Sequence, residues 1–314
     1  MRVLIVASYN KNRYAPFIVE QAESLQKAGC EIEWFGVQGK GISGYLKAVP
    51  KLRAKIRAFQ PDIIHAHYGL SCLLANLATR RVPIVSTYHG SDINNPTIRP
   101  MSKLAMRLSA WNIFVSKRTM DLAGVAMGKN VALIPCGVAL SEEQQMTKAE
   151  ARKELGWKAD EKKVLFAGAF DNDVKDPELA FEGVNELRSE GVNVELIELK
   201  GYTREEVNRL MCACDVLLMT SKTEGSPQVI KEAMACGCPI VSVDVGDVKE
   251  RVANIDGCFV VASREPKEIA EALDKAFAFK GKTNGRERII ADGLSNEAVA
   301  KRIMDIYCGV GNDC

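Results

Sequence analysis

The feature that most constrains the fold is a repeated alternation of short β-branched runs with amphipathic helical stretches. In the first half it reads RVLIVAS, PFIVEQAESLQKAG, EIEWFGV, YLKAVPKLRAKIRAF, DIIHAH, LSCLLANLATR, PIVSTYH, NIFVSK and VALIPCG. Strands that are apolar on both faces and alternate with helices are typical of a parallel sheet covered by helices. The first half therefore predicts a doubly wound α/β domain.

The alternation pauses at residues 141–163, which are polar, charged and helical in period, and which we interpret as a linker with a surface helix. It then restarts with KVLFAG, PELAFEGVNELRSEG, VNVELIEL, TREEVNRLMCAC, DVLLMTS, PIVSVDVG and CFVVAS. A chain of 314 residues suits two domains. We predict Rossmann-like domains over residues 1–140 and 141–295, with a terminal segment over 296–314. Because such sheets bind ligands at the carboxyl ends of their strands, two facing domains would share a cleft.

Composition indicates an ordinary soluble protein, with 47% hydrophobic and 26% charged residues. The opening apolar run, Val3 to Ala7, is too short for a signal peptide, and no run approaches the roughly 18 residues of a spanning helix. Ten cysteines without extracellular signals suit free thiols in a reducing cytoplasm. For the pairs Cys212/Cys214 and Cys236/Cys238 we favour buried small hydrophobes over a zinc site.

Charge is divided unevenly along the chain. Residues 1–140 hold 18 Lys and Arg against 7 Asp and Glu, whereas the rest holds 24 against 33. A positive half attracts polyanions such as a nucleic acid, an anionic membrane or a phosphate-bearing substrate. Five of the cations lie in one helical stretch: Lys47, Lys51, Arg53, Lys55 and Arg57. A solvated helix face and an interfacial helix on an anionic bilayer explain this stretch equally well.

Two short motifs are weak indicators of a binding site. The GxGxxG formed by Gly39, Gly41 and Gly44 follows the second strand rather than the first, so we favour a flexible loop over a dinucleotide site. Asp171-Asn172-Asp173 has the D-x-D form of some metal-dependent sugar transferases, but we favour a solvated acidic turn and predict no required metal.

All three histidines lie in the first half. His65 and His67 fall two apart in a predicted strand and point the same way, which favours a structural role. His89 directly follows the strand PIVSTYH, where this fold places ligands, so we assign it to function. Asp92 is predicted to cap the helix that follows.

The segment TEGSPQVIKEAMACG places Glu224 before a helix and Glu232 inside it. We predict Ser226 as the N-cap, Pro227 as the first helical residue and Gly237 as the stop. The predicted buried face is Val229, Ile230, Ala233 and Met234, and the opposite face is Gln228, Lys231, Glu232 and Ala235. A helix N-terminus suits a phosphate and carboxylates suit sugar hydroxyls, so the segment fits a phosphorylated, polyhydroxylated ligand. A pair of solvated charges is the alternative.

This segment, with AMACGCPIVSVDVG after it, resembles the E-x7-E segment of family 4 retaining glycosyltransferases of the GT-B fold, more loosely the bacterial members that build surface polysaccharides. The stretches DIIHAH, STYHGSD, FVSK, VALIPCGV and KVLFAG agree. SNEAVAKRIMDIY is similar to the terminal helix that crosses back to the first domain in these enzymes. The resemblance implies an acceptor-binding first domain and a nucleotide-sugar-binding second domain.

The resemblance also implies roles for single residues. Glu224 would hold hydroxyls of the donor hexose, His89 would contact the sugar near its reacting carbon, and Lys175 would neutralise the departing diphosphate. Glu232 would hold the ribose. The remaining donor contacts would come from Gly168, from the turn Gly225, Ser226, Pro227 and Gln228, and from Lys200 and Tyr202 near the base.

Two departures from the family pattern stand out. Gly168-Ala169-Phe170 lacks the usual arginine beside the diphosphate, and the turn ASYNKNRYAP after the first strand lacks a glycine pair. The resemblance implies retaining, metal-independent transfer of a hexosyl unit from a nucleoside diphosphate sugar to a lipid-linked or saccharide acceptor, in the cytoplasm or at the inner membrane face. Alternatives are a catalytically weak nucleotide-sugar-binding subunit, a basic nucleic-acid-binding protein, or a dehydrogenase using the GxGxxG glycines.

Overall fold

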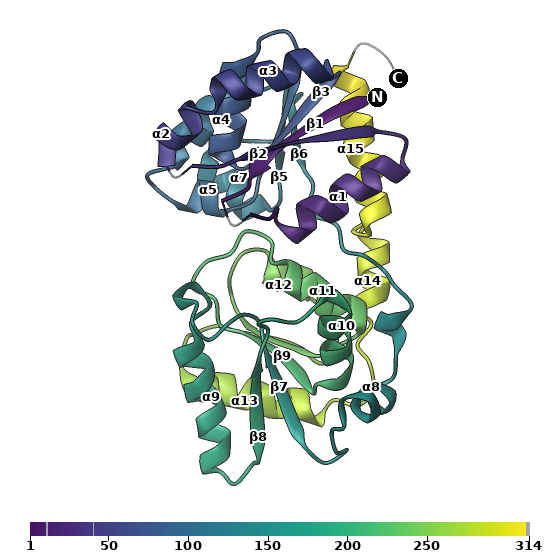
Figure 1. Cartoon of the computed structure of the whole chain (residues 1–314). Coiled ribbons are helices and arrows are strands. Elements are labelled where there is room, and N and C mark those ends of the chain that lie inside the picture. The colour runs from purple at the N-terminus through teal and green to yellow at the C-terminus, as the bar shows by residue number, and fades with distance from the viewer. Residues whose placement is uncertain (11, 40, 312–314) are drawn as a thin grey trace. The chain divides into compact units, whose positions relative to one another are not determined.

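The computed structural model describes residues 1–10, 12–39 and 41–311. The chain divides into two compact α/β units (Figure 1). The N-terminal unit comprises residues 1–137 together with 294–314, and the C-terminal unit comprises residues 138–293. The domain boundaries expected from the sequence lie within three residues of these divisions.

The N-terminal unit is built on a parallel sheet in the order β2-β1-β3-β4-β5-β6. Its strands are β1 Arg2–Ser8, β2 Glu31–Val37, β3 Ile63–His67, β4 Ile84–Tyr88, β5 Trp111–Phe114 and β6 Val131–Leu133. Strands β3 and β4 are buried at every position, as expected for a sheet covered on both faces. The doubly wound prediction is confirmed for this half.

Helices cover both faces of this sheet. They are α1 Pro16–Lys27, α2 Gly41–Leu46, α3 Val49–Phe59, α4 Gly69–Ala78, α5 Ser91–Asn94, α6 Arg99–Leu108, α7 Lys117–Ala123 and α15 Asn296–Val310. Helix α15 lies beside α1, although almost the whole chain separates them in sequence (Figure 1). Val299, Ile303 and Tyr307 of α15 join the core that α1 forms on one face of the sheet. The predicted return of the terminal helix to the first domain is therefore confirmed.

The C-terminal unit has a five-stranded parallel sheet in the order β11-β10-β9-β7-β8. Its strands are β7 Lys162–Phe166, β8 Val194–Glu198, β9 Val216–Met219, β10 Ile240–Val243 and β11 Cys258–Val261. Its helices are η1 Glu143–Gln145, α8 Lys148–Leu155, η2 Asp173–Lys175, α9 Pro177–Ser189, α10 Arg204–Ala213, α11 Gln228–Cys236, α12 Val248–Arg251, α13 Pro266–Ala278 and α14 Gly285–Ala291. Strand order reverses between β1 and β3 in one unit and between β7 and β9 in the other, and this is where doubly wound sheets bind ligands.

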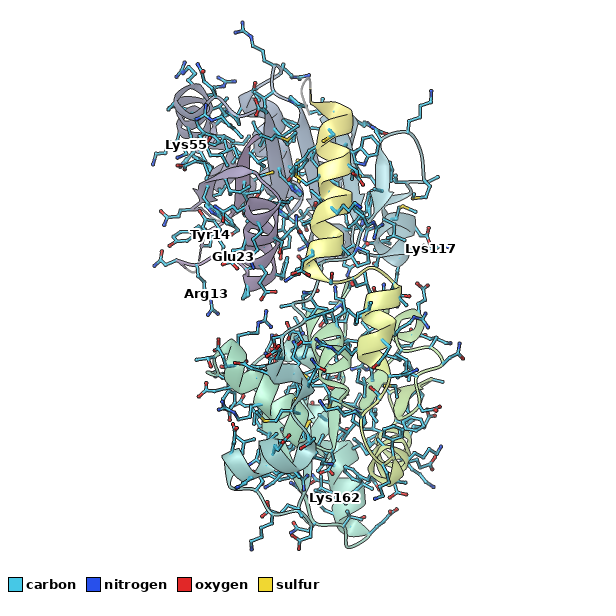
Figure 2. The ribbon with its side chains drawn as sticks, turned by 90° about the vertical axis from the view of Figure 1, so that its right-hand side faces the viewer. Arg13, Tyr14, Glu23, Lys55, Lys117 and Lys162 are labelled. Carbon is cyan, nitrogen blue, oxygen red and sulfur yellow. The ribbon has the colours of Figure 1, made fainter. Side chains whose placement is uncertain are left out.

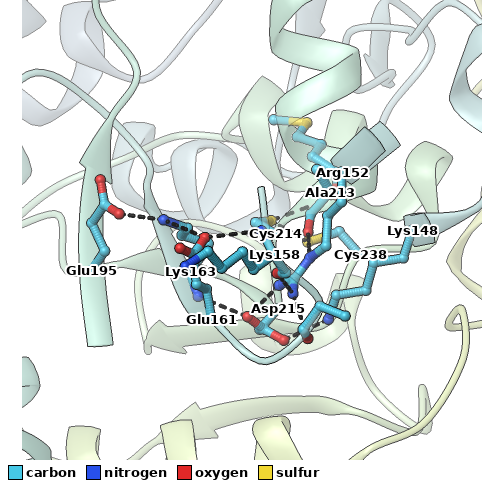
Figure 3. Close-up of polar contacts among 12 residues, drawn as sticks. Lys148, Arg152, Lys158, Glu161, Lys163, Glu195, Ala213, Cys214, Asp215 and Cys238 are labelled. Atoms are coloured by element: carbon cyan, nitrogen blue, oxygen red, sulfur yellow. Dashed lines mark hydrogen bonds and ion pairs between the residues drawn. The ribbon is translucent and has the colours of Figure 1, made fainter. Parts of the chain in front are cut away.

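The segment expected to be a linker with a surface helix is part of the C-terminal unit. Arg152 of α8 is only 6% exposed at its side chain, and it pairs with the buried Asp215 at 2.8 Å. Asp215 also accepts from Lys148 Nζ at 2.5 Å and from the Lys163 amide at 2.7 Å (Figure 3). This carboxylate, just before β9, therefore fastens α8 to the start of β7.

The loop expected around the GxGxxG glycines is partly helical. Gly41 and Gly44 lie in α2, and Gly39 precedes it with a φ of 150°. A Cβ on Gly44 would come within 2.8 Å of the Gly39 backbone, so these glycines allow the two backbones to approach. The glycine spacing thus serves local packing. Lys40 lies outside the described residues.

The cysteines of the C-x-C pairs are all buried, as predicted. Within residues 1–10, 12–39 and 41–311, no group of three or more His, Cys, Asp or Glu could hold a metal ion. Over the same residues, no helix combines the length and the apolar character that crossing a bilayer requires.

Candidate active site

In the C-terminal unit, two predicted site residues meet at the reversal of strand order. Lys175 ends η2, which follows β7, and Glu224 lies in the turn after β9. Lys175 Nζ is 2.6 Å from Glu224 Oε1, and their side chains are 23% and 17% exposed. The fold thus joins two residues far apart in sequence into one ion pair that solvent can reach.

Two glycines make room for this pair. A Cβ on Gly168 would lie 2.6 Å from Lys175 Cγ. A Cβ on Gly246 would lie 2.8 Å from the Gly225 carbonyl oxygen and 3.2 Å from Glu224 Cβ. Gly168 was a predicted site residue, whereas Gly246 was not. Its position after β10, the strand next to β9, is the signal that would have indicated it.

We expect Gly246→Ala to displace Glu224 and to lower turnover by up to about 100-fold, because small misplacements of reacting groups cost that much. Gly246 has a φ of 60°, so alanine also introduces strain of about 1–2 kcal/mol. Gly156→Ala is the matched control: its φ is 69° and nothing lies within 4 Å of the added Cβ. Turnover and thermal stability are measured for both variants. Equal turnover in the two variants would contradict the packing role of Gly246.

The turn between Glu224 and α11 is held by the side chain of Asp247, which the sequence did not indicate. Ser226 Oγ donates to Asp247 Oδ2 at 2.8 Å, and Asp247 pairs with Arg251 at 3.0 Å. Lys231 Nζ donates to Ser226 Oγ at 3.4 Å from within α11. The Ser226 hydroxyl therefore holds the predicted donor turn in place.

The predicted start of α11 and the predicted burial of three of its residues need correction, whereas its predicted end is confirmed. The N-cap is Pro227 rather than Ser226, whose hydroxyl is engaged by Asp247. Lys231, predicted on the exposed face, is 1% exposed. Ala235 is buried as well, and Val229 only half-buried, because both faces of this short helix meet other elements. Gly237 ends the helix in the left-handed conformation, as predicted.

The second glutamate of the segment has a different partner. Glu232 is 12% exposed at its side chain, and its Oε1 accepts from Nη1 of Arg204, the first residue of α10. Glu224 thus pairs with Lys175, and Glu232 pairs with Arg204. Gln228, which lies between the two glutamates in the sequence, is half-buried and is the first residue of α11.

The residues predicted near the base lie in the loop after β8. Lys200 pairs with Asp171 at 2.6 Å, and Tyr202 is 43% exposed. The Leu199 amide donates to the Gly168 carbonyl at 2.8 Å, which holds this loop beside the end of β7. Asp171 is exposed and engaged by Lys200, which agrees with the interpretation of the D-x-D as a solvated turn.

The structure provides a partner for Asp176, the residue after Lys175. Asp176 has a φ of 52°, a conformation that favours glycine. Its carboxylate accepts from Arg264 Nη2 at 2.5 Å, and the same guanidinium donates to the Thr220 and Ser221 carbonyls. Arg264 therefore ties the loop after β7 to the end of β9, on both sides of the strand reversal.

In the N-terminal unit, the three histidines form a stack. The ring centroids of His65 and His67 are 4.3 Å apart, and those of His67 and His89 are 5.3 Å apart. His65 bonds to the Tyr307 hydroxyl at 2.6 Å and to the Thr87 hydroxyl at 2.7 Å. This confirms a buried, hydrogen-bonded role for His65.

Burial keeps the inner histidines neutral. It lowers the pKa of His65 to about 3, and burial together with the charges of His65 and His89 lowers the pKa of His67 well below its usual value. His67 Nδ1 lies 3.0 Å from His89 Nε2, and His89 Nδ1 lies 3.6 Å from Cys136 Sγ. His89 is therefore held by neighbours on both ring nitrogens.

The prediction that Asp92 caps the helix that follows is wrong. Helix α5 has Gly90 as its N-cap, and the Asp92 carboxylate accepts from the Gly69, His89 and Gly90 amides at 2.9–3.1 Å. Burial raises the pKa of Asp92 to about 6, against the lowering effect of these backbone hydrogen bonds. Asp92 thus fixes the backbone at His89 to the start of α4.

A cavity of about 610 Å³ opens at the strand reversal of the N-terminal unit. Its lining includes Arg13, Tyr14, Tyr45 and Tyr68. Arg13 and Tyr14 come from the loop between β1 and α1 (Figure 2), and Tyr68 follows β3 with its ring 4.6 Å from that of His89. No ligand was assigned to this loop from the sequence, although its place after the first strand is the signal for a ligand site.

The basic residues of α3 divide into two groups. Arg53 donates to the Leu77 and Ala78 carbonyls at the end of α4, and Lys55 pairs with Glu33 at 2.5 Å. Lys47, Lys51 and Arg57 are exposed. The apolar residues Val49, Leu52, Ile56 and Phe59 pack on the core of their own unit. Helix α3 is thus docked on its own unit and keeps Lys51 and Arg57 exposed, with the exposed Lys47 just before its start.

The chain has two α/β units in tandem, each built on a parallel sheet, and its last helix packs on the first unit. Together with the ion-paired carboxylate at a strand reversal, this architecture defines a GT-B type glycosyltransferase. Family models agree in both halves. Residues 17–142 match "Glycosyltransferase Family 4", and residues 149–278 match "Glycosyl transferases group 1". The chain belongs to glycosyltransferase family 4.

Curated relatives are about 25% identical to the chain over the aligned residues. The putative teichuronic acid biosynthesis glycosyltransferase TuaC of Bacillus subtilis is 25% identical over 270 residues, which cover 78% of this chain and 67% of TuaC. A D-inositol 3-phosphate glycosyltransferase of Streptosporangium roseum is 25% identical over 326 residues, covering 85% and 74% of the two chains.

Solved structures share the fold at lower identity. Sucrose-phosphate synthase from Thermosynechococcus elongatus has a TM-score of 0.81 at 19% identity and covers 98% of both chains. Anabaena Alr3699/HepE in complex with UDP has a TM-score of 0.75 at 18% identity, covering 98% of this chain and 100% of HepE.

Proposed function

We propose that the protein transfers a hexosyl unit from a nucleoside diphosphate sugar to an acceptor hydroxyl, with retention of the anomeric configuration. The observation that carries this proposal is the Lys175–Glu224 pair at the strand reversal of the C-terminal unit. Lys175 offers a cation to the departing diphosphate, and Glu224 offers a carboxylate to the hexose hydroxyls. The structures of HepE with UDP and with UDP-glucose support a nucleotide sugar, UDP-linked, as the donor class.

In the reaction we propose, the bond between the anomeric carbon and the diphosphate oxygen breaks, and the acceptor oxygen bonds to the same face of that carbon. The acceptor proton passes to the departing diphosphate. Lys175 takes the electrostatic role that a metal ion has in other transferases, so we propose that no metal is required. His89, fixed by His67 and Asp92, contacts the donor sugar. The remaining donor contacts are those expected from Gly168, Gly225 to Gln228, Glu232, Lys200 and Tyr202.

For the acceptor we propose a lipid-linked glycan in the synthesis of a surface polysaccharide such as capsule. TuaC, whose name refers to teichuronic acid, and the lipopolysaccharide galactosyltransferase WaaB support this class. The cavity lined by Arg13 and three tyrosines offers a cation and aromatic faces to such an acceptor. The exposed Lys47, Lys51 and Arg57 support peripheral contact with an anionic membrane at its cytoplasmic face.

One departure favours a second candidate function. Ala169 stands where the family has an arginine for the diphosphate, which supports a nucleotide-sugar-binding subunit of low catalytic power. Family membership gives no support to the nucleic-acid-binding or dehydrogenase alternatives.

The test is a thermal-shift screen of UDP-, GDP- and ADP-sugars, followed by turnover with the donor that stabilises the protein most. We expect one donor class to raise the melting temperature, and transfer or slow hydrolysis of the same donor. Binding without either reaction would favour the binding subunit. Absence of any binding, with no change in Glu224→Ala, would refute both candidates.

A further inference from the structure

The carboxylate of Glu232 is held from one side only. Its Oε1 accepts from Arg204, while Oε2 has no hydrogen-bond partner among the described residues. The side chain is 12% exposed, so it remains accessible to a small ligand. One oxygen of a largely buried carboxylate is thus fixed by a cation, and the other is available.

Such an arrangement prepares a carboxylate to bind a pair of neighbouring hydroxyls. Each carboxylate oxygen has two acceptor positions, so an oriented Oε2 can accept from two O–H donors. A flexible glutamate loses rotamer entropy when it binds, and this loss is smaller when another residue already holds the side chain. Arg204 therefore lowers the cost of using Glu232 as a diol acceptor.

The charge of Arg204 gives a second reason for its pairing with Glu232. A donor diphosphate would approach the turn between Glu224 and Glu232, and two unpaired carboxylates would repel it. Lys175 pairs with the first and Arg204 with the second. The cation that pairs with Glu232 therefore comes from α10.

We infer that Arg204 is a positioning residue that orients Glu232 toward the two hydroxyls of the donor ribose. The inference rests on the proposed function, since it presumes that a ribonucleotide occupies the C-terminal unit. It assigns to α10 a part in nucleotide selectivity that the sequence did not indicate. The ligand class that it specifies is a nucleoside diphosphate with free 2′- and 3′-hydroxyls.

The experiment compares two ligands in calorimetry on the full chain: the nucleoside diphosphate of the preferred donor and its 2′,3′-dideoxy analogue. We expect Arg204→Gln to weaken ribonucleotide binding about tenfold and to leave dideoxynucleotide binding unchanged. Glu232→Gln should show the same pattern, and the double variant should match Glu232→Gln alone. Arg204→Lys should restore part of the loss.

Arg209→Gln is the matched control. Arg209 lies on the same helix, is 37% exposed against 35% for Arg204, and pairs with Glu154 at 2.7 Å. Equal weakening of both ligands in Arg204→Gln would overturn the inference and assign Arg204 to the diphosphate or the base. Unchanged or tighter ribonucleotide binding would overturn it as well. If the unaltered protein bound neither ligand, the proposed function itself would fail.

Discussion

Glu224→Gln should lower sugar transfer by about 10- to 100-fold, since a hydrogen bond to a charged group contributes about 1.5–3 kcal/mol. The substitution keeps the size of the side chain but removes the charge that pairs with Lys175. We expect Lys175→Gln to cause a similar loss. The double variant should lose less than the product of the two single effects, because the residues interact directly. Initial rates with the preferred nucleotide sugar measure all three.

Glu182→Gln is the control for this series. Glu182 is an exposed glutamate on α9 of the same unit, and we expect the same substitution there to leave transfer unchanged. Transfer at the normal rate in Glu224→Gln would contradict the assignment of the Lys175–Glu224 pair to the donor. Loss of transfer with unchanged binding of the free nucleotide would support contact of Glu224 with the sugar.

Asp215→Ala should lower the free energy of unfolding of the C-terminal unit by about 3–5 kcal/mol, the usual effect of leaving a buried charge without its partner. Arg152 would lose its ion pair while its side chain stays 6% exposed (Figure 3). The Lys163 amide would lose its acceptor too. The midpoint of urea unfolding and hydrogen exchange in α8 measure the effect.

The control for this prediction is a more exposed ion pair that also involves α8, in this case with α10. Arg209 and Glu154 pair at 2.7 Å, but their side chains are 37% and 47% exposed. Glu154→Ala should therefore cost at most about 1 kcal/mol. Similar losses in Asp215→Ala and Glu154→Ala would contradict the importance of burial at Asp215.

The sequence predicted the fold because its signals are local and repeated. Apolar strands followed by amphipathic helices specify parallel sheets, and the return of α15 was expected from its resemblance to a known terminal helix. The order of the strands then determines which loops meet. The roles of Lys175 and Glu224 were expected from the family resemblance, although their direct ion pair was not predicted.

What the sequence missed depends on distant partners. The helix begins one residue later than predicted, so Ser226 lies before the N-cap and its hydroxyl donates instead to Asp247, 21 positions along. Lys231 has the charge of a surface residue, yet it is buried near that same hydroxyl. The pair of Arg204 with Glu232 joins two helices, and no periodicity within either helix indicates it. Such contacts follow from the packing of elements rather than from local propensity.

The division of the chain also has a consequence for synthesis on the ribosome. The C-terminal unit is continuous, whereas the N-terminal unit needs α15 to cover the core that includes Val3, Ile5 and Tyr307. A nascent chain that has reached residue 293 holds every residue of the second unit, but one sheet face of the first is covered by α1 without α15. The unit that is synthesised first is therefore completed last, and until then its apolar sheet face is a surface for chaperones to protect.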